Sequence, residues 1–303
     1  MTTSRTPVRI DVYNRATNKI LADLENGVRT WQKPWNASHT AGRIALPLRH
    51  NGTPYRGVNV LLLWCEAMEK GFNSPIWMTY KQASEIGAQV RKGEQGSLVV
   101  YADRFTKKET DDQGAESERE IPFMKGYTVF NLEQIDGLPA QYVAKPAESP
   151  VPMARIENAE RLFAATGATI RHGGNRAFYS PAGDFVQMPP RESFKDAEAY
   201  SATLAHELTH WTAHPCRLAR ELGKRFGDEA YAAEELIAEM GSAFLCADLG
   251  ITPEVREDHA AYLASWLKVM KADSRAIFTA AAQAQRAADY LHALQTHAES
   301  AAA

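Results

Sequence analysis

At residues 206–210 the chain reads His206-Glu207-Leu208-Thr209-His210, inside a segment from 194 to 213 with the apolar spacing of an amphipathic helix. On a helix of 3.6 residues per turn, positions i and i+4 project from the same face, so both imidazoles can reach one cation. Glu207 is rotated away from that line and can act as a general base on a water molecule. The segment therefore predicts a metal-binding helix, with Zn²⁺ as the expected ion and another divalent metal such as Mn²⁺ as the alternative.

A catalytic zinc site needs a third protein ligand beside an open coordination position. The next expected helix, 228–249, carries Glu234, Glu235 and Glu239. Glu235 and Glu239 share a face, so one can bind the metal while the other orients a ligand histidine. We favour Glu235 as the ligand and Glu239 as the orienting carboxylate, and the swapped assignment stays open. His214 is a competing ligand, although its position beyond the second histidine favours a capping or surface role.

This pattern of HExxH followed by a glutamate about 25 residues on resembles the gluzincin-type zinc metallopeptidases over roughly residues 150–250. The resemblance implies that the metal polarises a scissile carbonyl and that Glu207 is the base. It further implies that an upstream strand, here 184–188, aligns a substrate peptide by edge pairing. A residue that stabilises the oxyanion is also expected in such enzymes, and Tyr231 is the candidate.

The composition of the chain excludes several classes of protein. The chain has 303 residues, of which 45% are hydrophobic and 23% charged, which is ordinary globular composition with room for two domains. Its apolar runs are too short to cross a bilayer, and residues 1–9 lack the apolar core of a secretion signal. Three cysteines without a CxxC pair exclude a disulfide framework or a cysteine zinc finger. We therefore expect a cytoplasmic protein with no membrane partner.

Charge is distributed unevenly along the chain. The net charge is −3, yet residues 1–102 hold 13 Lys/Arg against 7 Asp/Glu, whereas residues 144–303 hold 16 against 21. A basic head on an acidic body indicates that only the head meets a polyanion. Prolines within 143–152 predict a stiff linker. We therefore predict a two-domain α+β protein, with an N-terminal domain over residues 1–143 and a C-terminal domain over 144–303.

Periodicity and turn residues predict the elements of both halves. A capping box of Thr79 and Gln82 marks the start of one short helix. The N-terminal half is expected to hold helices at 10–28, 59–70 and 79–86, and strands at 97–105 and 123–132 joined by a charged, mobile tip at 106–120. The C-terminal half is expected to hold helices at 155–166, 194–213 and 228–249, strands at 169–172, 177–179 and 184–188, and a helical tail at 253–297.

Aromatic residues alternate with cations in the basic head. This combination suits single-stranded nucleic acid, because bases stack on rings while cations follow the phosphates. The alternative is that the aromatics fill a small core, and it is strongest for Trp64, which lies in an apolar helical run. The candidate DNA-binding residues are Trp31, Lys33, Trp35, Arg49, Tyr55, Arg56, Asn59, Trp77, Arg91 and Lys92.

Four segments of this half resemble the N-terminal domain of the ArdC-type antirestriction proteins. Residues 206–211 and 235–239 are similar to the zincin-like half of that family, so the resemblance covers nearly the whole chain. It implies a plasmid-encoded protein that binds single-stranded DNA and shields DNA entering by conjugation from host restriction. The four segments are Ile20-Leu21-x-x-Leu24-Glu25-x-Gly27-Val28-x-x-Trp31-x-Lys33-Pro34-Trp35, Pro54-Tyr55-Arg56-Gly57-Val58-Asn59, Trp77-x-Thr79-x-x-Gln82-Ala83 and Val90-Arg91-Lys92-Gly93-Glu94-x-Gly96.

The working hypothesis is that non-specific DNA binding brings a zinc metalloprotease-like domain to a host protein on the entering strand. One alternative is a non-catalytic module that blocks restriction by coating DNA and carries a structural or vestigial metal site. A second is a general metallopeptidase whose basic head docks an acidic protein.

Overall fold

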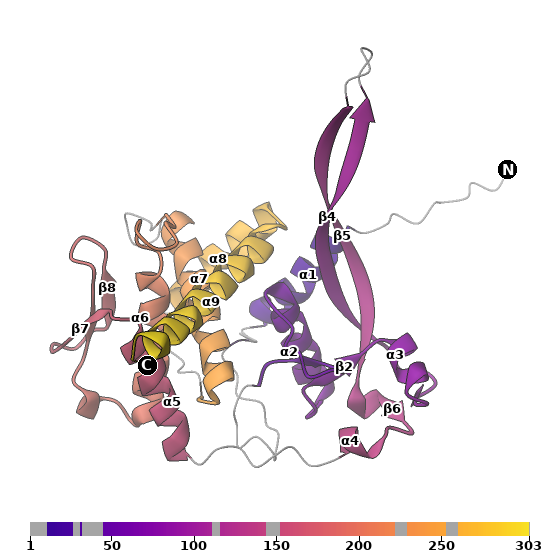
Figure 1. The fold of residues 1–303 in the computed structure, drawn as a ribbon, viewed down its shortest axis with the longest axis horizontal. Helices are drawn as coiled ribbons and strands as arrows, with labels where there is room; N and C mark the ends of the chain where they lie inside the picture. Colours follow the sequence, from indigo (N-terminus) through magenta and orange to yellow (C-terminus); the bar gives the residue numbers. More distant parts are fainter. Residues whose placement is uncertain are drawn as a thin grey trace.

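The protein is described from a computed structural model that covers residues 11–26, 31, 45–110, 116–143, 152–221, 229–252 and 260–302. Helices and small sheets alternate along the chain, and a long two-stranded ribbon projects from the N-terminal half (Figure 1). This is the mixed α+β content that the sequence predicts. The N-terminal elements are α1 Val12–Glu25, β1 Leu48–Arg49, α2 Val58–Lys70, β2 Ile76–Met78, α3 Tyr80–Glu85, β3 Gln89–Val90, β4 Ser97–Thr110, β5 Glu116–Asn131, β6 Ile135–Asp136 and α4 Ala140–Val143.

The larger N-terminal sheet has the strand order β1-β2-β5-β4. Strands β4 and β5 pair antiparallel from Ser97 opposite Val129 to Thr110 opposite Glu116. The prediction of an irregular tip is therefore wrong for residues 106–110 and 116–120, which continue the ladder, and residues 111–115 lie outside the described residues. Backbone hydrogen bonds of an antiparallel pair do not require a buried face, so charged residues can extend the ribbon into solvent.

Helix α2 is fastened to the base of this ribbon. The Asn59 side chain donates to the Val100 carbonyl at 2.9 Å and accepts from the Val100 amide at 2.7 Å. The Ser97 hydroxyl donates to Glu66 at 3.1 Å. The capping box of Thr79 and Gln82 is confirmed at the start of α3.

The C-terminal half packs helices around a small sheet. Its sheet has the order β7-β9-β8, with β9 parallel to β7 and antiparallel to β8. The expectation that 184–188 offers a free edge to a peptide is therefore wrong, since the backbone of β9 is paired on both sides. The elements are α5 Pro152–Ala165, β7 Thr169–His172, β8 Phe178–Ser180, β9 Phe185–Met188, α6 Ala197–Trp211, α7 Glu229–Leu249, α8 Ala260–Ala272 and α9 Ala276–Ala302.

One hydrophobic core runs through both halves of the chain. Trp31 packs against Trp266 with ring centroids 6.2 Å apart, and Trp64 packs against Phe244 at 6.0 Å. Helices α8 and α9 contact α1 and α2 as well as α7, so the predicted helical tail is shared between the halves. The division of the chain at 143/144 remains a proposal about sequence organisation. Within the described residues, no helix combines the length and apolar character needed to span a bilayer.

Candidate metal centre

Helix α6 presents the two histidines of the HExxH segment to the protein interior. Its first turn is capped by the Asp196 side chain, which accepts from the Ala199 amide at 2.7 Å. His206 and His210 are 4% and 9% exposed, and their Nε2 atoms lie 3.2 Å apart. The predicted alignment of both rings on one helix face is therefore present.

Helix α7 supplies the carboxylate that faces both rings. Glu235 Oε2 lies 3.6 Å from His206 Nε2, and Glu235 Oε1 lies 3.6 Å from His210 Nε2. Together these three side chains have one ligand atom each within 4.8 Å of the others. The geometry thus favours Glu235 over Glu239 as the third ligand.

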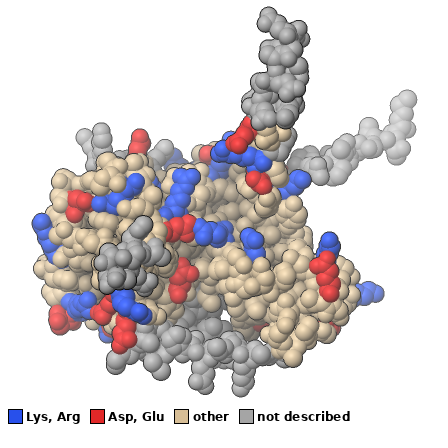
Figure 2. All heavy atoms as spheres, in the orientation of Figure 1, with Lys and Arg blue, Asp and Glu red and all other residues tan. Residues whose placement is uncertain are grey.

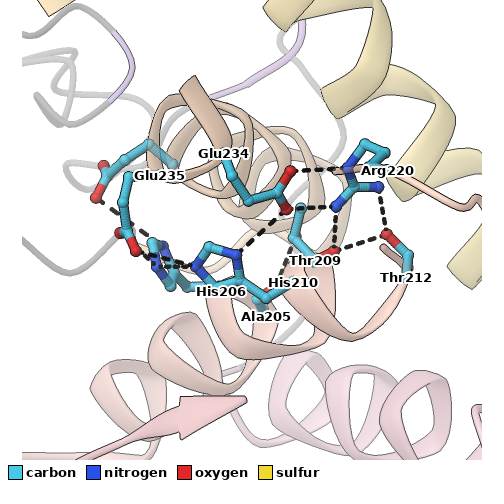
Figure 3. Close-up of polar contacts among 9 residues, drawn as sticks. Ala205, His206, Thr209, His210, Thr212, Arg220, Glu234 and Glu235 are labelled. Atoms are coloured by element: carbon cyan, nitrogen blue, oxygen red, sulfur yellow. Dashed lines mark hydrogen bonds and ion pairs between the residues drawn. The ribbon is translucent and has the colours of Figure 1, made fainter. Parts of the chain in front are cut away.

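Two further carboxylates lie near the Nδ1 atoms of the same two histidines. Glu239 Oε1 lies 3.9 Å from His206 Nδ1, on the side away from Glu235. Glu234 Oε1 is hydrogen-bonded to His210 Nδ1 at 3.3 Å. Figure 3 shows the second arrangement, in which Glu234 bridges His210 and Arg220. Such partners fix the orientation of a ligand histidine.

Sequence reasoning gave Glu234 no role and overlooked Arg220. Arg220 donates to Glu234 at 2.7 Å and 3.0 Å and to the Thr209 carbonyl at 2.8 Å. The signal that was available is the adjacent pair Glu234-Glu235, because neighbouring helical positions diverge by about 100° and can flank a ring on two sides. The arginine lies on a loop, and no periodic pattern predicts its direction.

The surroundings of the His210 ring favour its positively charged form. Burial lowers the pKa of His210, but the hydrogen bond with Glu234 and the charges of Glu235, Glu234 and Glu207 raise it to about 9. Burial raises the pKa of the Glu235 carboxyl, yet the hydrogen bond with His206 and the charges of both histidines hold it well below its usual range. Tyr231 is hydrogen-bonded to Glu235 as well. A buried pocket with surplus carboxylate is suited to a cation.

The donor set fits a divalent metal. Two imidazole nitrogens that face each other at 3.2 Å, with carboxylate oxygens 3.6 Å from each, converge on one point. Imidazole and carboxylate ligands suit both zinc and manganese. When bound there, such an ion supplies Lewis-acid polarisation of a carbonyl and lowers the pKa of water. Glu207, 2% exposed and between the two histidines in sequence, would take the proton.

Close contact between α6 and α7 positions the candidate ligands. A Cβ built on Gly241 would lie 2.6 Å from Thr209 Cγ2 and 2.9 Å from Thr209 Oγ1. Thr209 immediately precedes His210 on α6, and Gly241 lies two residues beyond Glu239 on α7. The absence of a side chain at Gly241 therefore lets the two ligand-bearing helices approach.

Several predicted DNA-binding side chains are inside the protein. The rings of Trp31, Tyr55 and Trp77 are 0%, 7% and 1% exposed, which contradicts the exposure needed to stack on bases. Trp31 is covered by Trp266 from α8, far along the chain. The Asn59 side-chain amide is hydrogen-bonded to the backbone of β4 at Val100.

The predicted cations have different surroundings. Arg49, Arg56, Arg91 and Lys92 are exposed, whereas Lys33 and Trp35 lie outside the described residues. Arg56 is paired with Asp289, and Arg91 with Glu94 and Asp136. Over the face drawn in Figure 2, basic and acidic side chains of the described residues are interspersed. The charge asymmetry of the sequence does not appear there as one basic surface.

Two protein-family models match this chain, one in the N-terminal half and one in the C-terminal half that contains the HExxH segment. Residues 10–130 match the N-terminal domain of the anti-restriction factor ArdC. Residues 157–283 match a family described as a zincin-like metallopeptidase.

Two protein relatives extend these matches. The chain is 46% identical over 307 positions to the uncharacterized protein y4eC of Sinorhizobium fredii, covering 99% of this chain and 97% of that protein. It is also 40% identical over 304 positions to DNA primase TraC of Escherichia coli, covering 95% of this chain but only 28% of the primase.

Solved structures agree with both comparisons. The metal-free crystal structure of the antirestriction protein ArdC from plasmid R388 is 48% identical, with a TM-score of 0.79 and coverage of 95% of this chain and 99% of that one. Its Mn(II)-bound structure is 46% identical, with a TM-score of 0.77 and coverage of 94% and 98%. Together with the convergent His/Glu donors, these likenesses support a divalent metal as the cofactor. The chain therefore belongs to the ArdC family of antirestriction proteins, as a two-domain α+β member with a zincin-like metallopeptidase domain.

Proposed function

We propose that this protein protects incoming plasmid DNA from host restriction by binding single-stranded DNA, without sequence preference, through its N-terminal half. It would act in the cytoplasm on DNA that enters by conjugation. Membership of the antirestriction family supports the biological role. The likeness to part of a DNA primase is in keeping with a plasmid context.

The proposal of DNA binding rests on an exposed aromatic cluster on the β4–β5 ribbon. Tyr101 and Tyr127 are 48% and 46% exposed, and their ring centroids lie 6.3 Å apart. Phe123 lies 6.1 Å from Tyr101, and Lys125 Nζ lies 5.3 Å from the Phe123 ring. Exposed rings beside a cation form a stacking surface for unpaired bases, each stacked base contributing about 1–3 kcal/mol.

A second contact surface is proposed beside α3. Tyr80, which is 52% exposed, lines a hollow of about 690 Å³ together with Arg91, Lys92 and Phe130. Glu94 and Asp136 lie in the same hollow and pair with Arg91, so Lys92 is the cation left to meet a phosphate. Arg49 remains a proposed phosphate contact, and Arg56 is one in which a phosphate would replace Asp289. Trp31, Tyr55 and Trp77 are assigned to the core.

The DNA proposal is tested by fluorescence anisotropy with a labelled single-stranded oligonucleotide. Each of Tyr101→Ala and Tyr127→Ala is expected to weaken binding about 5- to 150-fold, the equivalent of one stacked base. Phe178→Ala is the matched control, because Phe178 is a 43% exposed aromatic in the C-terminal half. Unchanged affinity of the Tyr101/Tyr127 double variant would refute the cluster as the binding surface.

We propose that the C-terminal half cleaves a host protein. His206, His210 and Glu235 would hold a divalent metal there, and Glu207 would be the general base. Among the described residues, β7 and β8 are the two outer strands of this sheet. Strand β8 Phe178–Ser180, which packs against α6, replaces 184–188 as the proposed edge for a substrate peptide. The buried, convergent donor set supports this reading.

The proposal of catalysis is tested separately from the proposal of DNA binding. Glu207→Gln leaves the three proposed ligands in place and is expected to lower protection of incoming plasmid DNA in cells, with DNA affinity unchanged. Full protection by this variant would refute a catalytic contribution. It would instead favour the alternative in which the protein blocks restriction without cleaving anything.

A further inference from the structure

A second cluster of metal-binding side chains lies at the loop that follows α6. Asp184, His214 and Cys216 have one ligand atom each within 4.8 Å of the others. Cys216 Sγ lies 2.8 Å from His214 Nδ1, and the Cys216 amide donates to the same nitrogen at 3.3 Å. None of these residues belongs to the His206, His210 and Glu235 group.

Hydrogen bonds hold the Asp184 carboxylate in place. Arg217 Nη1 donates to its Oδ2 at 3.0 Å, and the Tyr179 hydroxyl donates to its Oδ1 at 2.9 Å. Arg217 is itself fixed, because its Nε donates to the Trp211 carbonyl at 2.6 Å and its guanidinium lies 3.8 Å from the Trp211 ring centroid. Carboxylates that bind metals are commonly oriented by hydrogen bonds of this kind.

Access and backbone conformation also suit a site. Cys216 is exposed, whereas Cys65 and Cys246 are buried, so Cys216 is the thiol among the three that a dissolved ion can reach. Asp184 lies in the turn between β8 and β9 and adopts a positive φ of 45°, which is uncommon for a residue other than glycine. Its ion pair with Arg217 joins this turn to the loop after α6.

We propose that Asp184, His214 and Cys216 form a second divalent-metal site, selective for zinc-like ions over Mn²⁺. The thiol loses its proton to the solvent as the sulfur–metal bond forms, and His214 Nδ1 and an Asp184 oxygen supply the other donors. Thiolate ligands select zinc-class ions, whereas oxygen-rich sites suit manganese. Two donors about 2.0–2.3 Å from a tetrahedral zinc lie roughly 3.5 Å apart. The exposed Cys216 thiol, now 2.8 Å from His214 Nδ1, would therefore shift slightly to admit the ion.

The charges around the cluster are compatible with such an ion. Asp184 and a Cys216 thiolate carry two negative charges, which outweigh the single positive charge of Arg217. Three protein ligands leave a fourth tetrahedral position for water or an external ligand. This proposal depends neither on DNA binding nor on catalysis by Glu207.

The test is a metal titration of the purified full-length chain, stripped of metal and kept reduced with a non-chelating phosphine. Wild type is expected to bind two equivalents of Zn²⁺ or Co²⁺ and one of Mn²⁺. The Co²⁺ form should show the near-ultraviolet absorption band of a thiolate ligand. Cys216→Ser should lose one equivalent of Co²⁺ and the band while keeping the Mn²⁺ equivalent. His206→Ala should lose the other equivalent and keep the band.

Two matched variants complete the design. Cys246→Ala removes a buried thiol that lies outside the cluster, and it should keep both equivalents and the band. His214→Ala should weaken the second Co²⁺ equivalent at least tenfold. A wild-type chain that binds one equivalent of Co²⁺, or a Cys216→Ser variant that keeps two, would overturn the proposal.

Discussion

Arg220 and Glu234 form a buried ion pair, with Arg220 Nη2 2.7 Å from Glu234 Oε1, that joins the loop after α6 to α7. Their side chains are 5% and 4% exposed. The same glutamate oxygen is hydrogen-bonded to His210 Nδ1, so the arginine determines where a proposed metal ligand is held. Arg220 also donates to Thr212 Oγ1 at 2.8 Å, which ties it to the end of α6.

Arg220→Ala is expected to destabilise the metal-free protein by about 3–5 kcal/mol, because it removes the arginine from a buried ion pair and leaves the Glu234 carboxylate with His210 alone. The free energy of unfolding in urea checks this value. Lys81→Ala breaks an exposed ion pair with Glu85 and should change stability by less than about 1 kcal/mol. Equal effects of the two variants would show that the buried pair does not brace the loop.

Metal affinity separates the two glutamates that the sequence left as alternatives. Glu235→Gln removes a ligand and should abolish tight binding of Mn²⁺ to the His206/His210 site. Glu239→Gln changes only a group near His206 Nδ1, and it should weaken binding about 10- to 100-fold. Isothermal titration calorimetry measures both. A larger loss for Glu239→Gln would support the swapped assignment.

The sequence predicted local features better than distant contacts. The HExxH spacing and the Thr79/Gln82 capping box depend on residues within one helical turn, and both appear as expected. The burial of Trp31 was not predictable, because it depends on Trp266 from a helix near the other end of the chain. Local composition, which is rich in lysine and proline around Trp31, indicated exposure instead.

The same distinction applies within the metal centre. Helical periodicity places the histidine pair on one face of α6 and leaves Glu235 and Glu239 as alternatives on one face of α7. Only the distances to the two rings distinguish the glutamates. The brace provided by Arg220 depends on the path of a loop, which periodicity does not determine. The central position of β9 likewise depends on β7 pairing with it in parallel, and such non-local pairing has no short-range signal.

Gly241→Ala tests the contact between the two ligand-bearing helices. Alanine at an unconstrained helical position stabilises by up to about 1 kcal/mol relative to glycine. Here the added methyl meets Thr209 at 2.6 Å, so we expect a loss of about 1–3 kcal/mol instead. Thermal unfolding measures the change.

A second substitution makes the Gly241 prediction specific. Combining Gly241→Ala with Thr209→Ala removes the clashing Thr209 Cγ2 and Oγ1 atoms. The double variant should recover part of the lost stability, which a double-mutant cycle would reveal as a favourable coupling. Additive losses would contradict the proposed close contact.

Acid sensitivity should depend on Glu66, which joins α2 to the ribbon. Burial raises the pKa of this carboxyl, but the hydrogen bond and charge of Lys70, with Lys19 and Ser97, bring it below the ordinary value of 4.5. A carboxyl whose pKa is lowered on folding contributes stability above its unfolded pKa, and the contribution is lost as the pH falls through the folded pKa.

Urea unfolding between neutral pH and pH values below 4.5 should therefore show Glu66→Gln destabilised at neutral pH, with the difference from wild type shrinking in acid. Glu85→Gln, at an exposed ion pair, should follow the wild-type profile. A Glu66→Gln difference that stays constant across this pH range would show that the Glu66 charge does not stabilise the fold.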